Sequence, residues 1–411
     1  MKTDIKFFMK HALKQKDRSF YHIHLDKLVS NIKFWRNHFP DITPYYAVKC
    51  NPNPQVLSVM ALNGCSFDCA SKGEMKLIEN LQSQFNTSPD VIFANPIKMN
   101  SHLRYSDKNG INLMTADSVE ELAKIDKYCS RADVVMRIAV DDSNSLCQFN
   151  KKFGLYPLKD NLEKWFDKFD TLKNSNLVGV SFHVGSGCSS SDSYRLAIEE
   201  ARKCFDFGRS RGYKMRILDI GGGFIQKEPL ISQVSETVNK ALHDNFKSIN
   251  PMVIAEPGRF LVSNIADLYV KVTGKKTENG VIKYYVNNSV YGDFNSKMFD
   301  YATFEFDIIK KRTNNFISKG ETGAWFDNSN DKHHSKNSTI FGSTCDSIDV
   351  IVENVQVPEL EIGDYLKFRD MGAYTMAASS TFNGIPKPYL YFLGKDLLSL
   401  RKMGILSDKL S

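Results

Sequence analysis

The strongest constraint on the fold is an alternation of short apolar runs with amphipathic stretches, repeated eight times between residues 43 and 258. The apolar runs are rich in β-branched residues, as buried parallel strands are, and the stretches between them carry apolar residues at helical spacing. Eight strand–helix repeats predict an α/β fold with a (β/α)8 TIM barrel. The predicted strands span residues 43–49, 66–71, 91–95, 112–117, 133–140, 177–185, 216–222 and 252–258, and the clearest helices span 73–84, 118–129 and 193–210.

The pattern changes after Phe260, where alternating polar and apolar segments are separated by Gly, Asn and Pro. This pattern predicts a C-terminal, mainly antiparallel β-domain that also takes up the strand-like segment 19–25. We therefore expect a TIM-barrel domain over residues 26–262 and a β-sheet domain built from residues 1–25 and 263–411. Residues 313–338 are rich in Asn, Ser, Lys and His, which predicts a long disordered loop.

Composition excludes several classes of protein. No apolar run is long enough to span a membrane, and the N-terminus has no signal-peptide core, so we expect a cytoplasmic protein. Eight cysteines without a C-x-x-C pair predict reduced thiols rather than a disulfide framework or a zinc site, and we expect no metal. The net charge of +7 is spread along the whole chain, so neither nucleic acid nor a membrane is an expected partner.

Reactive residues follow several predicted strands, at the end of the barrel where active sites form. Lys49 lies at the tip of the first strand, Asp68 ends the second and His183 ends the sixth. A lysine there is useful when its pKa is lowered and its amine forms a Schiff base. Taken singly, however, such a lysine more often simply emerges into solvent, and residues such as Asp68 and His183 are more often structural polar groups.

The seventh and eighth strands suggest the ligand. Gly221, Gly222 and Gly223 follow the seventh, where absent side chains let backbone N–H groups approach a phosphate, and Glu256 and Arg259 follow the eighth. Loops after these two strands commonly form the phosphate site of this fold. A lysine for an aldehyde, a phosphate cradle, a flat imidazole and a carboxylate for a ring nitrogen together complement pyridoxal phosphate. A glutamate beside that nitrogen keeps it protonated, which suits decarboxylation.

In order along the chain, these motifs resemble those of the eukaryotic-type ornithine decarboxylases, which are pyridoxal-phosphate-dependent basic amino acid decarboxylases with an alanine-racemase-like fold. The resemblance covers roughly residues 19–395 and rests on residues 46–51, 67–72, 183–187, 219–224, 256–259, 290–292, 344–346 and 371–375.

The resemblance implies a reaction and a coenzyme site. L-ornithine would be converted to putrescine and CO₂, in polyamine biosynthesis, through a Lys49 aldimine and a quinonoid intermediate. Asp68 would lie near Lys49, His183 would stack on the coenzyme ring, and Glu256 would pair with the ring nitrogen. The residues that the resemblance assigns to the phosphate are Ser186, Gly222, Gly223, Arg259 and Tyr374.

The resemblance also implies a homodimer whose active sites are shared between subunits. Cys345 would enter from the partner chain as the proton donor, with Asp346 beside it. Asp300 and Asp346 would bind the distal ammonium of the substrate, and Phe382 would wall its aliphatic stem. Taken alone, a Cys-Asp pair in a β-domain more often serves packing than catalysis.

Alternatives remain open. The preferred substrate could be lysine or arginine, since one methylene gives limited discrimination. A catalytically inactive regulatory paralogue has the same fold, and an antizyme-like regulator is a possible partner. The chain also departs from the family pattern, because Ile225-Gln226 replaces the usual proline and glycine, and Asn288-Ser289 replaces an expected acid-glycine pair before Tyr291. The second departure has no functional interpretation from sequence.

Overall fold

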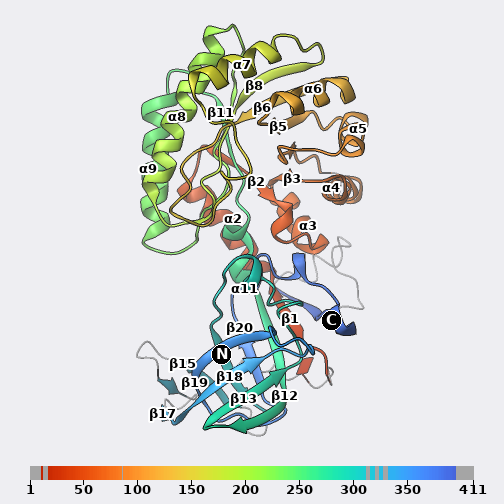
Figure 1. The fold of residues 1–411 in the computed structure, drawn as a ribbon, viewed down its shortest axis with the longest axis vertical. Coiled ribbons are helices and arrows are strands. Elements are labelled where there is room, and N and C mark those ends of the chain that lie inside the picture. The colour runs from red at the N-terminus through yellow and green to blue at the C-terminus, as the bar shows by residue number, and fades with distance from the viewer. Residues whose placement is uncertain are drawn as a thin grey trace. The chain divides into compact units, whose positions relative to one another are not determined.

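The computed structural model describes residues 11–12, 17–85, 87–311, 315–319, 324–326 and 332–394. The chain divides into two compact units, Leu28–Leu261 and Met1–Lys27 with Val262–Ser411 (Figure 1). Among the described helices, none has both the length and the apolar character needed to cross a membrane. All eight cysteines are free thiols.

The first unit contains a closed parallel barrel, which confirms the predicted TIM barrel. Its strands follow one another around the barrel in chain order, so each strand–helix–strand step brings the next strand alongside the last. Inward-facing side chains such as Tyr45, Ile92, Val135 and Ile254 are buried together and fill its interior. The barrel strands are β2 (Ile42–Ala47), β3 (Ser66–Cys69), β4 (Val91–Phe93), β5 (Leu113–Ala116), β6 (Ala132–Arg137), β8 (Ser175–Ser181), β10 (Ile217–Asp219) and β11 (Met252–Ala255).

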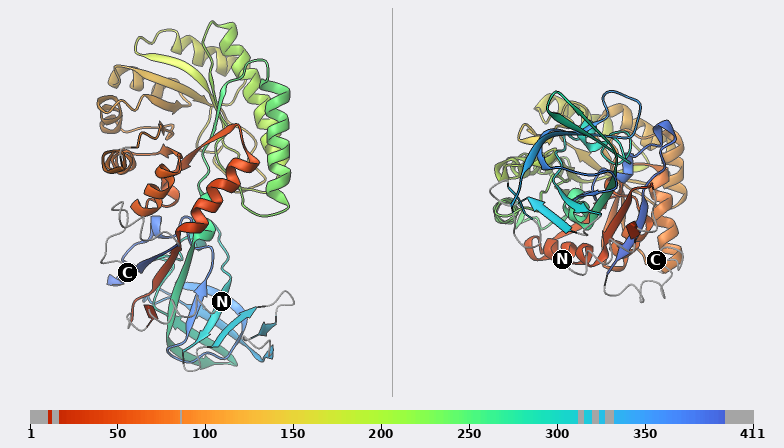
Figure 2. Two further views of the ribbon diagram at one scale, coloured as in Figure 1. Left: turned by 180° about the vertical axis from the view of Figure 1, so that it is seen from behind. Right: turned by 90° about the horizontal axis from the view of Figure 1, so that it is seen from below.

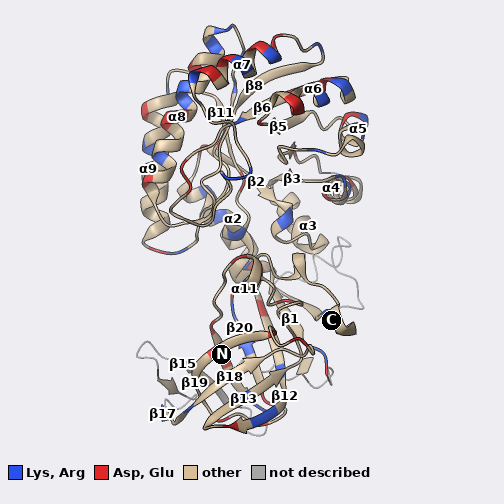
Figure 3. Cartoon of the chain, in the orientation of Figure 1, with Lys and Arg blue, Asp and Glu red and all other residues tan. Residues whose placement is uncertain are grey.

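Helices alternate with these strands, and two of them, α3 and α6, begin with a side-chain cap. The Asn53 side chain accepts hydrogen bonds from two backbone N–H groups at the start of α3, and the Ser118 hydroxyl accepts one, from Glu121 N–H, at the start of α6. Figure 3 shows basic and acidic residues interspersed on α7, α8 and α9, so the net charge is not gathered into one stripe there. The helices are α2 (Leu25–His38), α3 (Pro54–Leu62), α4 (Lys72–Phe85), α5 (Asn100–Lys108), α6 (Val119–Tyr128), α7 (Lys159–Phe169), α8 (Ser191–Ser210), α9 (Leu230–Phe246) and α10 (Arg259–Val262).

The second unit is an 11-stranded sheet, which confirms the predicted β-domain. Most of its ladders are antiparallel, while β13 pairs with β18, and β1 with β21, in parallel. The N-terminal strand β1 lies between β12 and β21, as Figure 2 shows from behind. The strands are β1 (Phe20–His24), β12 (Ala266–Glu278), β13 (Val281–Val286), β14 (Phe306–Lys310), β15 (Asn315–Lys319), β16 (Trp325–Phe326), β17 (Lys332–His333), β18 (Ser335–Phe341), β19 (Val350–Pro358), β20 (Tyr365–Phe368) and β21 (Tyr389–Leu393).

The disordered loop predicted over residues 313–338 is wrong for the residues that the structure describes there. They form β15, β16, β17 and the start of β18, at one edge of the sheet and in its interior ladder. Trp325 is buried, and its indole N–H donates to the Gln356 carbonyl at 2.7 Å. Its ring lies 5.6 Å from that of Phe306. Ile317 is buried as well. Buried apolar side chains such as Trp325 and Ile317 thus hold strands whose other residues are mostly polar.

Candidate active site

Lys49 projects from the carboxyl end of the first barrel strand. After β2 the chain enters a short 3₁₀ turn, Val48–Cys50, whose outer two residues are buried while 44% of the Lys49 side chain is exposed. Its Nζ donates to Oδ2 of Asp68 at 2.8 Å. Asp68 is buried on the neighbouring strand β3, and across the described chain no hydrogen bond reaches its Oδ1. The site therefore offers an accessible amine beside a carboxylate that has acceptor capacity in reserve.

His183 provides a neutral, flat ring just beyond β8. The backbone N–H of Gly185 donates to Nδ1 at 3.0 Å, so the neutral ring carries its proton on Nε2. Burial lowers the pKa of His183 well below its usual range, and the positive charges of Arg137 and Lys49 lower it further. The edge of the Phe149 ring packs 4.9 Å from the imidazole. One tautomer and one ring orientation are thus fixed.

Two carboxyl groups are buried side by side at the carboxyl ends of β10 and β11. Glu256 N–H donates to the Gly221 carbonyl at 2.7 Å, and Gly221 N–H donates to Oδ1 of Asp219 at 2.9 Å. Burial is the largest cause that raises the pKa of both Glu256 and Asp219, and the charge of Asp219 raises that of Glu256 further. The Glu256 carboxyl donates a hydrogen bond to Asp219, so the pair shares a proton. Asp219 was not predicted as a site residue, although it lies two residues before the first of the three glycines.

The glycines after β10 leave no room for side chains. A Cβ on Gly222 would lie 2.7 Å from the Glu256 carbonyl oxygen and 3.0 Å from His183 Nε2. Gly223 has φ of +98°, and its Cβ would lie 2.5 Å from the Gly185 carbonyl oxygen. Only glycine satisfies these contacts, so the backbone here is open to close approach by a ligand.

Two further barrel residues predicted for the phosphate lie near these loops in the fold. Ser186 begins the short strand β9 (Ser186–Cys188), which pairs with β7 (Ser145–Cys147). Cys188 N–H donates to the Gly223 carbonyl at 3.0 Å, which ties β9 to the glycine segment. Arg259 is the first residue of α10.

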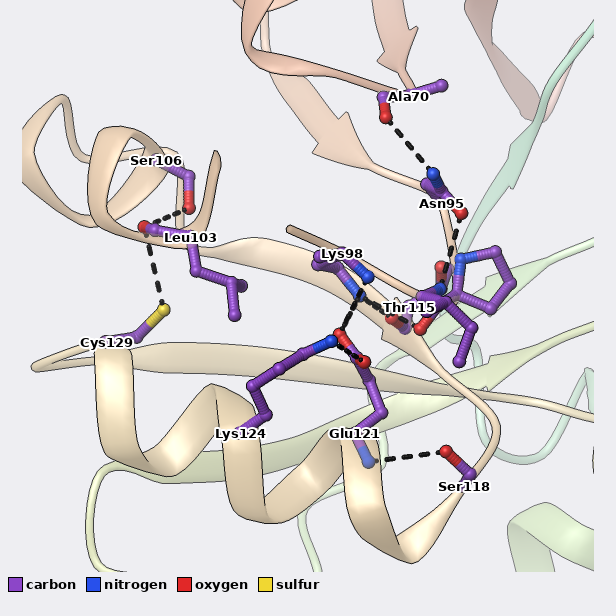
Figure 4. A network of polar contacts seen from close by, with 12 residues as sticks. Ala70, Asn95, Lys98, Leu103, Ser106, Thr115, Ser118, Glu121, Lys124 and Cys129 are labelled. Carbon is purple, nitrogen blue, oxygen red and sulfur yellow. Dashed lines mark hydrogen bonds and ion pairs between the residues drawn. The ribbon is translucent and has the colours of Figure 1, made fainter. Parts of the chain in front are cut away.

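A buried lysine in the segment after β4 contacts strand β5 and helix α6, and Asn95 of the same segment contacts the residues after β3 (Figure 4). The Lys98 amine donates to the Thr115 carbonyl and lies 3.6 Å from Oε1 of Glu121, which also accepts from Lys98 N–H. Asn95 Nδ2 donates to the Ala70 carbonyl at 3.3 Å, two residues beyond Asp68. Burial lowers the pKa of Lys98 to about 8, which Glu121 partly opposes. These contacts brace the strand end that carries Asp68.

In the second unit, the loop between β18 and β19 carries Cys345 and Asp346. Cys345 N–H donates to Oδ1 of Asn383 at 3.0 Å, and the Tyr291 hydroxyl donates to Oδ2 of Asp346 at 2.5 Å. That bond is the largest cause that lowers the pKa of Asp346. The Phe382 ring lies 4.5 Å from that of Tyr291. The structure thus groups three predicted residues, and it adds Tyr291 and Asn383, to which sequence reasoning gave no role.

The other two predicted residues of this unit lie on separate loops. Asp300 follows the short helix α11 (Ser296–Phe299), where its N–H donates to the Ser296 carbonyl at 2.9 Å. Tyr374 lies beyond β20 with φ of +55°.

Comparison with known proteins decides the family. Residues 25–263 match the family model described as the pyridoxal binding domain of pyridoxal-dependent decarboxylases. The chain belongs to the pyridoxal-dependent decarboxylase family. It is 36% identical over 394 residues to the ornithine decarboxylase of Rattus norvegicus, across 91% of this chain and 80% of the rat protein. It is 39% identical over 370 residues to antizyme inhibitor 2 of Xenopus laevis, across 86% of this chain and 76% of that protein.

A solved structure agrees with the family assignment. The arginine decarboxylase of Paramecium bursaria Chlorella virus, bound to agmatine, superimposes with a TM-score of 0.85 at 31% identity, and the match covers 96% of this chain and all of the viral one. The predicted membership and the predicted coenzyme class of this decarboxylase family are confirmed.

The barrel residues fit pyridoxal phosphate. The Lys49 amine is accessible to an aldehyde, and buried Asp68 Oδ1 has no hydrogen bond from the described residues. His183 is flat and neutral, and Glu256 and Asp219 hold a proton suited to a ring nitrogen. The glycine segment leaves no room for side chains, so its backbone N–H groups are open to a phosphate.

Proposed function

We propose that this pyridoxal-dependent decarboxylase converts L-ornithine to putrescine and CO₂, in polyamine biosynthesis. The observation that carries the proposal is the Lys49–Asp68 contact of 2.8 Å at the barrel end that also holds the buried Glu256. Similarity to ornithine decarboxylases, 36% for the rat enzyme over most of the chain, supports this substrate.

The barrel residues would hold the coenzyme in a defined orientation. When bound, pyridoxal phosphate supplies an electron sink for the pair released as the bond from Cα to the carboxylate breaks. Lys49 would hold the aldehyde, with Asp68 orienting its amine. The face of His183 would support the ring, and Glu256 would keep a proton on the ring nitrogen, drawing on the proton that it shares with Asp219. The phosphate would be held by Ser186, Gly222, Gly223, Arg259 and Tyr374.

Residues of the β unit would recognise the substrate and finish the reaction. Asp300 and Asp346 would bind the distal ammonium by charge-assisted hydrogen bonds. Tyr291 stabilises Asp346 as a carboxylate, the form that this contact needs. Phe382 would wall the aliphatic stem. Cys345 would give a proton to the substrate carbon after CO₂ leaves.

We propose a cytoplasmic homodimer in which Cys345 and Asp346 complete the active site of the partner chain. In this arrangement residues 26–262 form the coenzyme-binding domain, and residues 1–25 with 263–411 form the domain that carries the substrate-recognition loop. Three exposed aromatic residues of this domain, Phe299, Tyr301 and Phe382, support an interface on it, because aromatic side chains are enriched at interfaces.

The proposed reaction is tested by CO₂ release from ornithine, lysine and arginine, with and without added pyridoxal phosphate. We expect the highest kcat/KM with ornithine. Lysine, one methylene longer, should be slower by roughly ten- to hundredfold. Faster turnover of lysine or arginine would correct the substrate, and turnover that does not depend on the coenzyme would contradict the mechanism.

Asp346→Ala tests substrate recognition. Loss of a charge-assisted contact of about 2 kcal/mol should raise the KM for ornithine by roughly thirtyfold. Glu353→Ala is a matched control, because it removes an exposed carboxylate from the same unit. Steady-state kinetics of both variants decide the matter, and an unchanged KM in Asp346→Ala removes this residue from the recognition site.

A second candidate function is regulation without catalysis. The 39% identity to an antizyme inhibitor favours it. An inactive protein has no need to retain the Lys49–Asp68 contact, the shared proton of Glu256 or the Cys345 thiol, all of which are present. A colourless purified protein that releases no CO₂ and binds an antizyme-type partner would establish the second function in place of the first.

A further inference from the structure

Asn288, which departs from the family pattern, uses every hydrogen-bonding position of its side chain. Its Oδ1 accepts from Ser289 N–H at 2.7 Å and from Asp293 N–H at 3.0 Å. Its Nδ2 donates to Oδ2 of Asp293 at 2.9 Å and to the Ser19 hydroxyl at 3.1 Å. The residue is buried. A buried amide with two donors and two acceptors in use fixes its surroundings closely.

Asp293 is the main partner of this amide and is itself fully enclosed. Besides Asn288 Nδ2, the Tyr21 hydroxyl donates to its Oδ1 at 3.1 Å. Burial raises the pKa of Asp293 to about 6, while the bonds from Asn288 and Tyr21 and the charge of Lys387 lower it. The hydrogen bonds that stabilise the Asp293 carboxylate therefore come from neutral groups, and the bond from Asn288 is the shorter of the two.

The same segment holds the loop that precedes Cys345. The Asn288 carbonyl accepts from Ser343 N–H at 3.0 Å and from the Ser343 hydroxyl at 3.3 Å. Asp349 bridges the two segments, since its Oδ1 accepts from Val290 N–H and its Oδ2 from both N–H and Oγ1 of Thr344. The backbone entering the loop is thus attached to the segment of Asn288 at two points.

A third attachment reaches the proposed substrate carboxylate directly. Tyr291 lies between Asn288 and Asp293 in the chain, and its hydroxyl donates to Asp346 at 2.5 Å. The hydrogen bond between the side chains of Asn288 and Asp293 closes the turn formed by residues 288–293, and so it fixes the position of the Tyr291 backbone. Displacement of the turn would move the donor away from Asp346.

We propose that Asn288 and Asp293 form a positioning pair that fixes the substrate-recognition loop through Tyr291 and Ser343, and so sets the affinity for the distal ammonium of the substrate. The proposal rests on the proposed decarboxylase function. The pair needs one amide and one carboxyl, and either order satisfies it. An Asp at 288 still accepts from both backbone N–H groups, and an Asn at 293 can donate its amide hydrogen back to that Asp.

The test is a swap. Asn288→Asp places two carboxyl groups in contact, so the pair must hold a proton to stay together. We expect the KM for ornithine to rise about tenfold relative to wild type at pH 8, with a smaller rise near pH 6 and a lesser effect on kcat. Adding Asp293→Asn in the same chain should restore KM to within about twofold at both pH values.

Hydrogen–deuterium exchange of the peptide covering residues 342–349 reports on the loop without any turnover. Exchange should accelerate in Asn288→Asp and return to the wild-type rate in the swapped variant. Ile308→Val, which removes one buried methylene from β14 of the same unit, is the control for general destabilisation. It should lower the unfolding temperature and leave both KM and loop exchange unchanged.

The outcomes separate the two proposals. If wild-type protein releases no CO₂ from ornithine, the proposed function fails, and loop exchange alone still decides whether the pair positions the loop. If Asn288→Asp leaves exchange and KM unchanged, or if the swap does not rescue either one, the positioning pair is excluded while the decarboxylase activity stands.

Discussion

At the residue scale, the chemistry of the site is set by which charges surround each group. The Lys49 amine is held in place by the Asp68 carboxylate, while burial and the positive charges of Arg137 and Lys49 lower the pKa of His183 and keep its ring neutral. Glu256 meets a second carboxyl and retains a shared proton. An anchored amine, a neutral imidazole and a protonated carboxyl pair thus lie at one end of the barrel, and each suits a different part of one coenzyme.

Lys49→Ala should abolish the visible absorbance of bound coenzyme and lower turnover by at least about a hundredfold, because no other amine takes over the aldehyde. Absorbance spectra and CO₂ release measure this. Lys76→Ala, an exposed lysine on α4, is the control and should leave both unchanged. Coenzyme absorbance that persists in Lys49→Ala, together with borohydride labelling of another lysine, would move the site elsewhere.

Asp293 makes stability depend on pH. Its pKa is raised to about 6 in the folded protein, so it keeps a proton that the unfolded chain has lost above about pH 4. The unfolding free energy should therefore fall as pH rises from about 4 to about 6. Asn does not titrate, so Asp293→Asn should remove on the order of 2 kcal/mol of this decline. Urea unfolding at pH 4.5 and pH 7 measures it.

The matched control for this measurement is Asp160→Asn, an exposed carboxylate at the start of α7. It should keep the wild-type decline in stability between the two pH values. An equal decline in wild type and Asp293→Asn would show that the carboxyl titrates normally in the folded protein.

From the sequence we could predict site residues whose type is unusual at the end of a buried strand. We could not predict residues whose role depends on which side chain they contact in the fold. Lys49 and the glycines were predictable because a lysine or a run of glycines at the end of a buried strand is rare without a purpose. Asp219 and Tyr291 are ordinary residues until the fold brings Glu256 and Asp346 against them. The exchange of an acid-glycine pair for Asn288-Ser289 was visible, yet its meaning depends on Asp293 and Ser19.

At the element scale, the number and order of barrel strands were predictable, while their ends were less so. The sixth predicted strand, residues 177–185, is Ser175–Ser181 in the structure, since the chain leaves the ladder where His183 turns toward the glycines. A run of apolar residues indicates that a strand is present. It does not show at which residue the strand ends and the polar loop begins. The prediction for residues 313–338 failed for the opposite reason. The described strands there contain few apolar residues, among them Ile317 and Trp325, and these are separated by Asn, Ser, Lys and His.

The Lys98 network belongs to this scale, because it holds elements together. Lys98→Met leaves the Glu121 carboxylate buried beside a single remaining cation, and breaking a buried pair in this way should destabilise by about 3 kcal/mol. Lys124→Met removes the more exposed partner of the same carboxylate and should cost about 1 kcal/mol or less. Chemical unfolding of both variants measures the difference, and equal losses would contradict a special role for the buried amine.

At the scale of the whole molecule, the two units divide the proposed work. The barrel holds every group assigned to the coenzyme ring, and the β unit holds every group assigned to the distal end of the substrate, together with the proton donor. The sequence indicated both units through the change of pattern after Phe260. The sequence could not indicate which chain of the proposed dimer supplies the substrate-binding groups and the proton donor to a given barrel. The pattern of apolar and polar residues carries no information on how chains assemble.

Complementation tests the shared site. Lys49→Ala and Cys345→Ala chains are each expected to be inactive alone. When they are mixed, unfolded and refolded together, about half of the dimers should be hybrids, and in each hybrid one of two sites receives an intact lysine and an intact thiol. Activity should therefore return to about a quarter of the wild-type value. Mixing Lys49→Ala with Glu256→Ala is the control, since both changes fall on the barrel and no intact site can form. No recovery in the first mixture would place the thiol and the lysine of each site on one chain. Recovery in the control would show instead that Lys49 and Glu256 of one site come from different chains.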